Sequence, residues 1–262
     1  MELIVWIILF SLLGGVLSVL AASLFLLLPE HFRNQGLPHF VSFAIGALLG
    51  AAFLALLPHS MEANSGMDFH NIGLTVLLGI LVFFLLEKMV LWRHCHSDHC
   101  EAHTPHDAYE KGSKHSTVVL ILFGDGMHNF VDGILIAAAF MTDIHLGVVT
   151  SIAVATHEIP QEVGDFAILL HSGLGRMKAF LLNIASSMAT LLGAILAYFS
   201  LSGLEGAIPY ILAIAASSFI YIAMADLLPG LHKKTQLSET VKQVVLIVSG
   251  VATIYIAHSS LH

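Results

Sequence analysis

Charged residues and cysteines are scarce in this sequence of 262 residues. Only 11% of the residues are charged, 57% are hydrophobic, and the mean hydropathy is +0.87. A soluble domain has about 25% charged and about 45–50% apolar residues, so an ordinary soluble protein is excluded. The composition indicates a polytopic membrane protein. The only two cysteines, Cys95 and Cys100, lie in one polar stretch, which excludes a secreted disulfide scaffold.

The N-terminus lacks the basic residues of a signal peptide. Glu2 stands where such a peptide has its basic region, and no clear cleavage site follows, so we interpret this segment as a retained transmembrane helix. Apolar runs of about 20 residues or more, the length that spans a bilayer, recur along the whole chain. They predict about eight helices, near residues 2–28, 38–61, 70–93, 116–141, 145–171, 176–200, 206–230 and 240–260.

Lysine and arginine are missing from one side of this arrangement. When the eight runs are threaded through a membrane, all 10 Lys and Arg residues fall on the same side. By the positive-inside rule, that side faces the cytoplasm and both chain termini lie outside. The runs that end near Pro58 and Pro229 both finish in Leu-Leu-Pro and cross in opposite directions, which indicates inverted-repeat character.

Two of the predicted helices carry polar residues at helical spacing, where a lipid-facing helix would be apolar. The first stripe belongs to the stretch GDGMHNFVDG and consists of Asp125, His128, Asn129 and Asp132. The second belongs to HEIPQEVGD and consists of His157, Glu158, Gln161, Glu162 and Asp165. A carboxylate near the middle of a membrane helix costs roughly 2.5–3.5 kcal/mol, so something must compensate these groups.

A divalent cation between the two helices is the compensation that we favour. Imidazole and carboxylate ligands suit Zn²⁺, Fe²⁺ or Mn²⁺. The alternative is an interhelical hydrogen-bond and ion-pair network, but no Lys or Arg lies in either apolar segment to neutralise the acids. An intramembrane zinc protease would need the motif His-Glu-x-x-His, and Gln161 stands where its second histidine should be. An enzyme is therefore not expected, although a membrane sensor that binds metal without moving it remains an alternative.

These motifs resemble those of the ZIP (Zrt/Irt-like) family of divalent-metal transporters. The resemblance rests on His-Asn-x-x-Asp-Gly at 128–133 and His-Glu-x-Pro at 157–160, and it extends to GALLGAAFLALLP, FFLLEK and FIYIAMADLLP elsewhere. It is strongest to the branch whose fifth helix reads His-Glu-x-Pro-His-Glu. It implies an all-α bundle of eight transmembrane helices, outward termini, a His-rich cytosolic loop and ion movement into the cytoplasm.

The resemblance also implies the roles of individual residues. The transport ligands would be His128, Asn129, Asp132, His157, Glu158 and Gln161. Secondary or pathway ligands would be Asp125, Glu162, Asp165 and Asp226. Gln161 departs from the histidine of this branch and from the glutamate of others, which favours one bound ion over two. Zinc is the expected substrate, with Fe²⁺, Mn²⁺ and Cd²⁺ as alternatives.

The sequence thus divides into helices within 1–93, a polar loop at 94–115 and further helices within 116–262, all in one membrane domain. The loop is dense in metal-ligating side chains, and it either binds metal or is a tolerant polar linker: His94, Cys95, His96, His99, Cys100, His103 and His106. Besides metal and lipid, a homodimer partner is expected from the family. No nucleic acid and no organic cofactor are expected. The compact loops indicate a prokaryotic cytoplasmic membrane.

Overall fold

A computed structural model describes residues 2–62, 69–92, 114–232 and 236–261, and this part of the chain is built from helices joined by short turns. The helices are α1 (Leu3–Gly14), α2 (Val16–Leu26), α3 (Glu30–Ala51), η1 (Ala52–Leu56), α4 (Leu57–Glu62), α5 (Phe69–Trp92), α6 (Lys114–Thr142), α7 (Ile144–His171), α8 (Arg176–Leu201), η2 (Glu205–Ala207), α9 (Ile208–Tyr221), η3 (Ile222–Leu227), α10 (Leu228–Leu231) and α11 (Leu237–Leu261).

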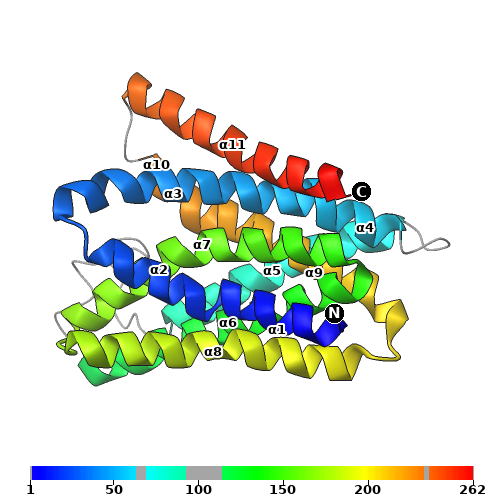
Figure 1. Cartoon of the computed structure of the whole chain (residues 1–262), viewed down its shortest axis with the longest axis horizontal. Coiled ribbons are helices and arrows are strands. Elements are labelled where there is room, and N and C mark those ends of the chain that lie inside the picture. Colours follow the sequence, from blue (N-terminus) through cyan, green and yellow to red (C-terminus); the bar gives the residue numbers. More distant parts are fainter. Residues whose placement is uncertain (1, 63–68, 93–113, 233–235, 262) are drawn as a thin grey trace.

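The long helices run back and forth along one axis, and both ends of the chain lie at the same end of the bundle (Figure 1). We call this the terminus end. At one edge of the bundle α11 lies along α3, and at the other α8 lies along α6, with α7 between them. An even number of membrane crossings would place both termini on one side of the membrane, which stays a prediction.

Seven helical spans in the described residues are long and apolar enough to cross a membrane: Leu3–Leu26, Glu30–Glu62, Phe69–Lys88, Val118–Thr142, Arg176–Leu201, Ile208–Leu231 and Leu237–Ser259. The predicted fifth span, α7, is 28 residues long, but its polar stripe lowers its hydropathy and it is not among the seven. Its inner face is nevertheless packed, since His157, Glu158 and Glu162 are all buried. The helical membrane bundle is confirmed, and an eighth crossing by α7 stays a prediction.

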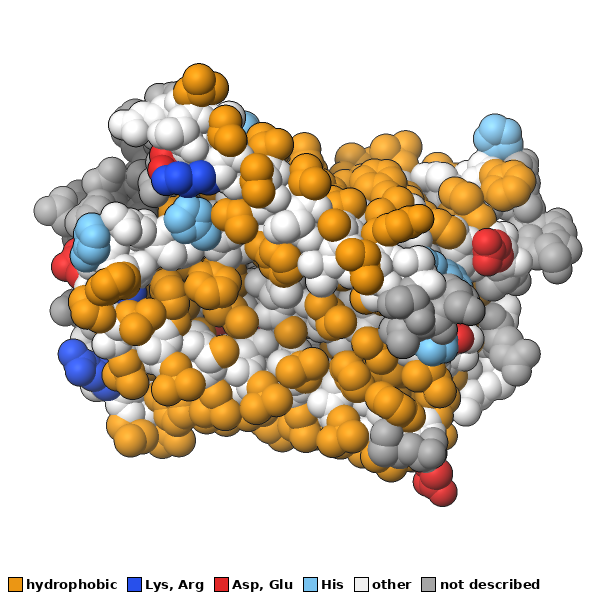
Figure 2. All heavy atoms as spheres, turned by 45° about the horizontal axis from the view of Figure 1, so that its top comes forward, with side chains coloured by type: hydrophobic (Ala, Val, Ile, Leu, Met, Phe, Trp, Pro, Cys, Tyr) orange, Lys and Arg blue, Asp and Glu red, His pale blue; other side chains and the backbone are white. Residues whose placement is uncertain are grey.

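Basic side chains gather at the end opposite the termini, which we call the basic end. In Figure 2 the Lys and Arg atoms lie only at the left, whereas the right end of this face carries acidic and histidine side chains. The described basic residues near helix ends agree with this: Arg33, Lys88, Arg176, Lys178 and Lys242. The charge asymmetry that the sequence predicted is therefore a property of the folded bundle.

Glycines bring α6 and α8 unusually close together. A Cβ atom placed on Gly133 of α6 would collide with the backbone carbonyl of Thr190, and one on Gly193 of α8 would collide with the carbonyl of Phe130. Small residues allow such backbone contact between membrane helices. This contact fixes the position of the polar stripe on α6 relative to α8.

One predicted boundary was wrong. The sequence places a break between Pro29 and Pro38, but α3 begins directly after Pro29 and contains Pro38. The carbonyl four residues before Pro38 belongs to Asn34, which is exposed, so water can take the hydrogen bond that the proline ring cannot.

The two Leu-Leu-Pro helix ends share an unexpected feature. Each is preceded by one turn of π-helix, η1 before Pro58 and η3 before Pro229. In both, the N–H of the residue before the proline bonds to the carbonyl five residues back instead of four. A wide turn of this kind often lies at functional sites. The same π-helical turn thus occurs in two spans that run in opposite directions. This agrees with the inverted-repeat character that the Leu-Leu-Pro ends indicated.

Candidate metal centre

The turn between α6 and α7 places the two polar stripes against each other. Asp143 caps α7, since its Oδ1 accepts hydrogen bonds from the backbone N–H groups of His145 at 2.8 Å and Leu146 at 3.1 Å. This cap starts α7 two residues after α6 ends, so the helices are tight antiparallel neighbours. Because the helices are antiparallel, polar residues at a similar distance from the turn on α6 and on α7 lie at the same height in the bundle.

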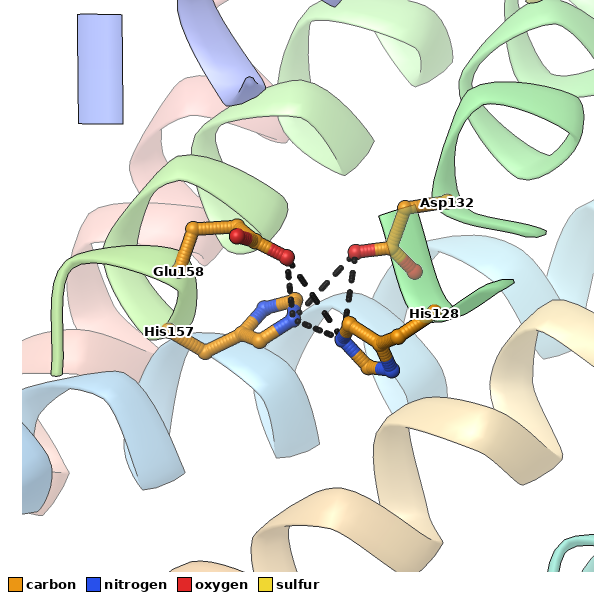
Figure 3. Close-up of side chains that lie close together, drawn as sticks. All are labelled: His128, Asp132, His157 and Glu158. Carbon is orange, nitrogen blue, oxygen red and sulfur yellow. Dashed lines mark hydrogen bonds and ion pairs between the residues drawn. The ribbon is translucent and has the colours of Figure 1, made fainter. Parts of the chain in front are cut away.

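Four of the predicted ligands meet in one cluster (Figure 3). His128 and Asp132 come from α6, and His157 and Glu158 come from α7. The Nε2 atoms of the two histidines are 3.2 Å apart. Asp132 Oδ2 lies 3.7 Å from His128 Nε2 and 3.3 Å from His157 Nε2, while Glu158 Oε1 lies 3.5 Å and 3.8 Å from the same two nitrogens. We call these four residues the His/carboxylate cluster.

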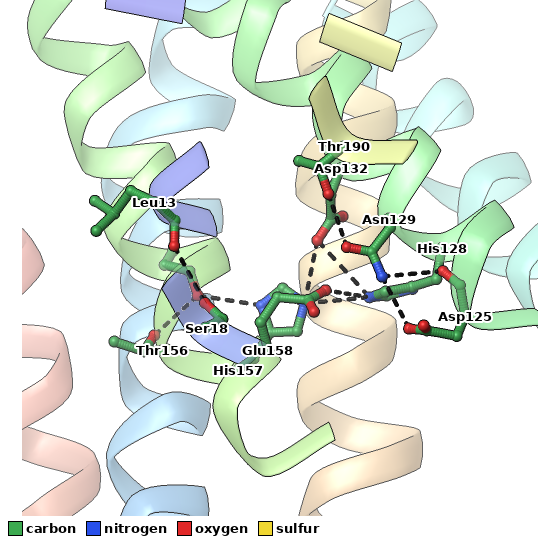
Figure 4. A network of polar contacts seen from close by, with 11 residues as sticks. Leu13, Ser18, Asp125, His128, Asn129, Asp132, Thr156, His157, Glu158 and Thr190 are labelled. Atoms are coloured by element: carbon green, nitrogen blue, oxygen red, sulfur yellow. Dashed lines mark hydrogen bonds and ion pairs between the residues drawn. The ribbon is translucent and has the colours of Figure 1, made fainter. Parts of the chain in front are cut away.

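A backbone contact orients one imidazole of the cluster. His157 Nδ1 lies 3.1 Å from the carbonyl oxygen of Ala153, one turn earlier on α7 (Figure 4). A carbonyl oxygen only accepts, so the proton belongs on Nδ1 and the lone pair on Nε2 points into the cluster. His157 is 1% exposed, and this nitrogen therefore faces the other ligands and not water.

The predicted ligand Asn129 is buried beside the cluster but makes other contacts. Its Oδ1 accepts a hydrogen bond of 2.7 Å from Thr190 of α8, and its Nδ2 donates to Asp125 Oδ1 at 2.8 Å (Figure 4). In this arrangement the side chain links α8 to Asp125. Gln161, half-buried on α7, also lies beside the Asp125 carboxylate. Both amides thus contact Asp125, and their roles as metal ligands stay predictions.

A second group of possible ligands adjoins the first and contains only carboxylates. Asp125, Glu158 and Glu162 have oxygen atoms within 4.8 Å of one another. We call these three residues the carboxylate group, and Glu158 belongs to both sets. Both oxygens of Glu158 and of Glu162 are buried without a hydrogen-bond partner. Asp165 lies one turn further along α7 and is half-buried.

No Lys or Arg of these two helices lies near these acids. Lys114 is the first residue of α6, α7 contains neither Lys nor Arg, and the described Lys and Arg residues of other helices lie near helix ends. Burying unpaired carboxylates in an apolar bundle is costly unless cations compensate them. A purely structural ion-pair network therefore fits this site poorly, whereas a site for a divalent cation fits it well.

Other predicted residues lie elsewhere. Asp226 sits on η3 and is exposed on the surface of the chain. On the neighbouring helix α5, Glu87 accepts a hydrogen bond from the hydroxyl of Tyr221. The loop ligands His94, Cys95, His96, His99, Cys100, His103 and His106 lie outside the described residues. Sequence reasoning missed the contribution of Thr190, because small hydroxyl residues on α8 look like ordinary packing residues.

Comparison with known proteins gives one consistent result. A family model for the ZIP zinc transporter matches residues 2–116 and 92–258. Zinc transporter ZIP13 of Mus musculus is 32% identical over 271 residues, which cover 91% of this chain and 75% of the relative. Zinc transporter ZIP13 of Pongo abelii is 34% identical over 227 residues, covering 82% and 65%. Zinc transporter ZIP4 of Homo sapiens is 32% identical over 287 residues, covering 86% and 44%. The chain thus spans between 44% and 75% of the length of these relatives.

Proposed function

Because this chain belongs to the ZIP zinc transporter family, as its motifs predicted, we propose that it carries zinc across a membrane through the site between α6 and α7. The family consists of transporters and not enzymes, so the intramembrane protease is not favoured. Zinc is the substrate named for the relatives above. Fe²⁺, Mn²⁺ and Cd²⁺ are secondary candidates.

The geometry of the His/carboxylate cluster is the observation that carries this proposal. Tetrahedral zinc has bonds of about 2.0–2.2 Å to nitrogen and oxygen, which places its ligand atoms about 3.3–3.6 Å apart. Five of the six separations between these four ligand atoms lie between 3.2 and 3.8 Å, and all six are within 4.8 Å. Two imidazoles and two carboxylates at these separations suit a tetrahedral shell, which supports zinc over Mn²⁺ with its octahedral preference.

The carboxylate group supplies a second position for the ion. Asp125 precedes His128 on α6 and Glu162 follows Glu158 on α7, so both lie closer to the basic end. Glu158 is shared, and an ion bound in the His/carboxylate cluster can move to the oxygen-only group without leaving its carboxylate. Oxygen ligands bind zinc less tightly than imidazole does, and weaker binding favours release. Asp165 extends this path by one further turn.

Charge distribution and the resemblance to the family support one direction of transport. The basic end carries the Lys and Arg residues and therefore faces the cytoplasm by the positive-inside rule. We propose that zinc enters from the terminus end and leaves at the basic end, with both termini outside and α7 as the eighth crossing. Residence in a prokaryotic cytoplasmic membrane stays a prediction, as does a homodimer, and the three relatives named above are animal proteins.

Zinc flux into proteoliposomes that contain a fluorescent chelator tests the proposal. The purified protein is compared with Asp132→Ala and His157→Ala, and His171→Ala is the matched control. His171 also lies on α7 and also has its Nδ1 on the carbonyl four residues earlier, at 3.3 Å, but it is exposed at the basic end. We expect flux in the wild type and in His171→Ala, and loss of flux in the other two.

Two results would contradict the proposal. Equal flux in the wild type and in His157→Ala would exclude the His/carboxylate cluster as the transport site. Saturable zinc binding without flux in a folded wild-type protein would favour the alternative of a membrane sensor.

A further inference from the structure

A second pair of histidines lies outside the transport site. His59 belongs to α4 and His258 to α11, and their ring centroids are 5.3 Å apart with an angle of 71° between the ring planes. The residues are far apart in the sequence and meet only because α11 packs along the span that α3 and α4 share. Both side chains are half-buried.

This pair has a ring distance and a ring angle close to those of the two histidines in the transport site. His128 and His157 have ring centroids 5.5 Å apart and an interplanar angle of 88°, and their Nε2 atoms face each other. His157 is oriented by the carbonyl four residues earlier, and His59 is oriented in the same way, with its Nδ1 2.9 Å from Ala55 O. In His157 and in His59, the proton therefore lies on Nδ1, and Nε2 of the same ring carries the lone pair that can bind a metal ion.

The pair lies where ions in water can reach it. His59 is three residues before the end of the span Glu30–Glu62, and His258 is one residue before the end of the span Leu237–Ser259. Both positions are in the last turn before the terminus end. This end carries no Lys or Arg in the view of Figure 2, so no fixed cationic side chain visible there opposes the approach of a metal ion.

We propose that His59 and His258 form a binding site for a divalent transition-metal ion at the terminus end. Two imidazoles supply half of a tetrahedral shell, and water completes it at the membrane surface. Such an open site binds and releases zinc readily. The inference goes beyond the proposed transport function, because binding here requires neither flux nor the His/carboxylate cluster.

Acylation of histidines by diethyl pyrocarbonate, with and without zinc, tests this site. Peptide mass spectrometry measures how strongly zinc protects each single histidine. An imidazole nitrogen that holds zinc has no lone pair to react. At a zinc concentration about ten times the dissociation constant, mass action predicts about tenfold slower acylation. We expect protection of His59 and His258 in the wild type and also in His157→Ala, which lacks the transport site. A residue-resolved signal separates this pair from every other histidine.

His59→Phe keeps an aromatic ring in place and removes the ligand. We expect zinc no longer to protect His258 in this variant, and the reciprocal variant His258→Phe to lose protection at His59. The matched control is His70→Phe at the start of α5, also at the terminus end, which should leave both residues protected. Absence of protection in the wild type, or unchanged protection of His258 in His59→Phe, would overturn the proposal. Flux is measured separately, so failure here differs from failure of the transport function.

Discussion

His128 and His157 face each other across the α6–α7 interface with their Nε2 atoms 3.2 Å apart. Because the contact with Ala153 holds the proton of His157 on Nδ1, its Nε2 presents a lone pair to the other imidazole. Two neutral lone pairs at this distance repel unless a proton or a metal ion lies between them. With Asp132 and Glu158 beside both rings, the arrangement is complementary to a cation, and the following predictions depend on it.

Glu158→Gln should abolish the stabilisation that zinc gives to the protein. The change keeps the shape of the side chain but removes a charge shared by both ligand groups. For one site, ligand at 100 times its dissociation constant stabilises the folded state by about 2.7 kcal/mol, or roughly 5–11 °C in Tm for a chain of about this size. Thermal unfolding in detergent, with zinc or with a chelator, measures the difference. A zinc-dependent shift in Glu158→Gln as large as in the wild type would contradict the assignment.

Thr190→Val should reduce transport without removing any ligand. The hydroxyl of Thr190 donates to Asn129 Oδ1, and Asn129 in turn holds Asp125. Loss of a residue that orients a metal ligand typically weakens metal binding by about 10–100-fold, and we expect the lower end of this range because the effect passes through two side chains. The KM of zinc flux should rise. Thr253→Val is the control, since its hydroxyl bonds only within the exposed face of α11.

Competition between metals should follow coordination geometry. The His/carboxylate cluster offers two nitrogens and two oxygens at tetrahedral separations, so excess Cd²⁺ should compete with zinc for uptake, whereas Mn²⁺ and Mg²⁺ should compete weakly. Zinc flux measured with each competitor at equal excess gives the order. Stronger inhibition by Mg²⁺ than by Cd²⁺ would indicate that an all-oxygen site limits transport.

Gly133→Ala should destabilise the bundle, whereas Gly124→Ala should not. Both glycines lie on α6, but a Cβ on Gly133 would collide with the backbone of α8 and one on Gly124 would have nothing within 4 Å. Overpacking of this kind costs about 1–3 kcal/mol, and alanine in an open helical position is neutral or slightly favourable. Chemical denaturation of the two variants measures the contrast. Equal stability would show that α6 and α8 separate easily.

Cysteine labelling should place the two ends of α8 on opposite sides of the membrane. In a protein with Cys95 and Cys100 replaced by serine, Ser202→Cys lies at the terminus end and Gly175→Cys at the basic end. Both positions are exposed. We expect a membrane-impermeant maleimide to label Ser202→Cys in intact cells and Gly175→Cys only after lysis. The reverse pattern would invert the proposed orientation and the direction of transport.

The sequence by itself determined the class of protein, the approximate helical spans, the sidedness of the basic residues and the two polar stripes. These features are local or additive, since the length of an apolar run and the spacing of residues along one helix need no knowledge of neighbours. It also showed that Asp132 and Glu158 have no Lys or Arg within their own apolar segments to pair with. The helix faces that meet in the His/carboxylate cluster could thus be predicted from residue types and spacing, whereas metal binding stays a proposal.

Only the tertiary structure decided which of these side chains meet. Asn129 belongs to the same stripe as His128, but the close approach of α8 at Gly133 brings Thr190 to its amide, so that this amide links Thr190 to Asp125. The pairing of His59 with His258 likewise depends on helices that are distant in the chain. The spacing of polar and apolar residues along one helix shows on which face of that helix a residue lies. Contacts between faces depend on how closely and at what register the helices pack, and that is set by the whole bundle.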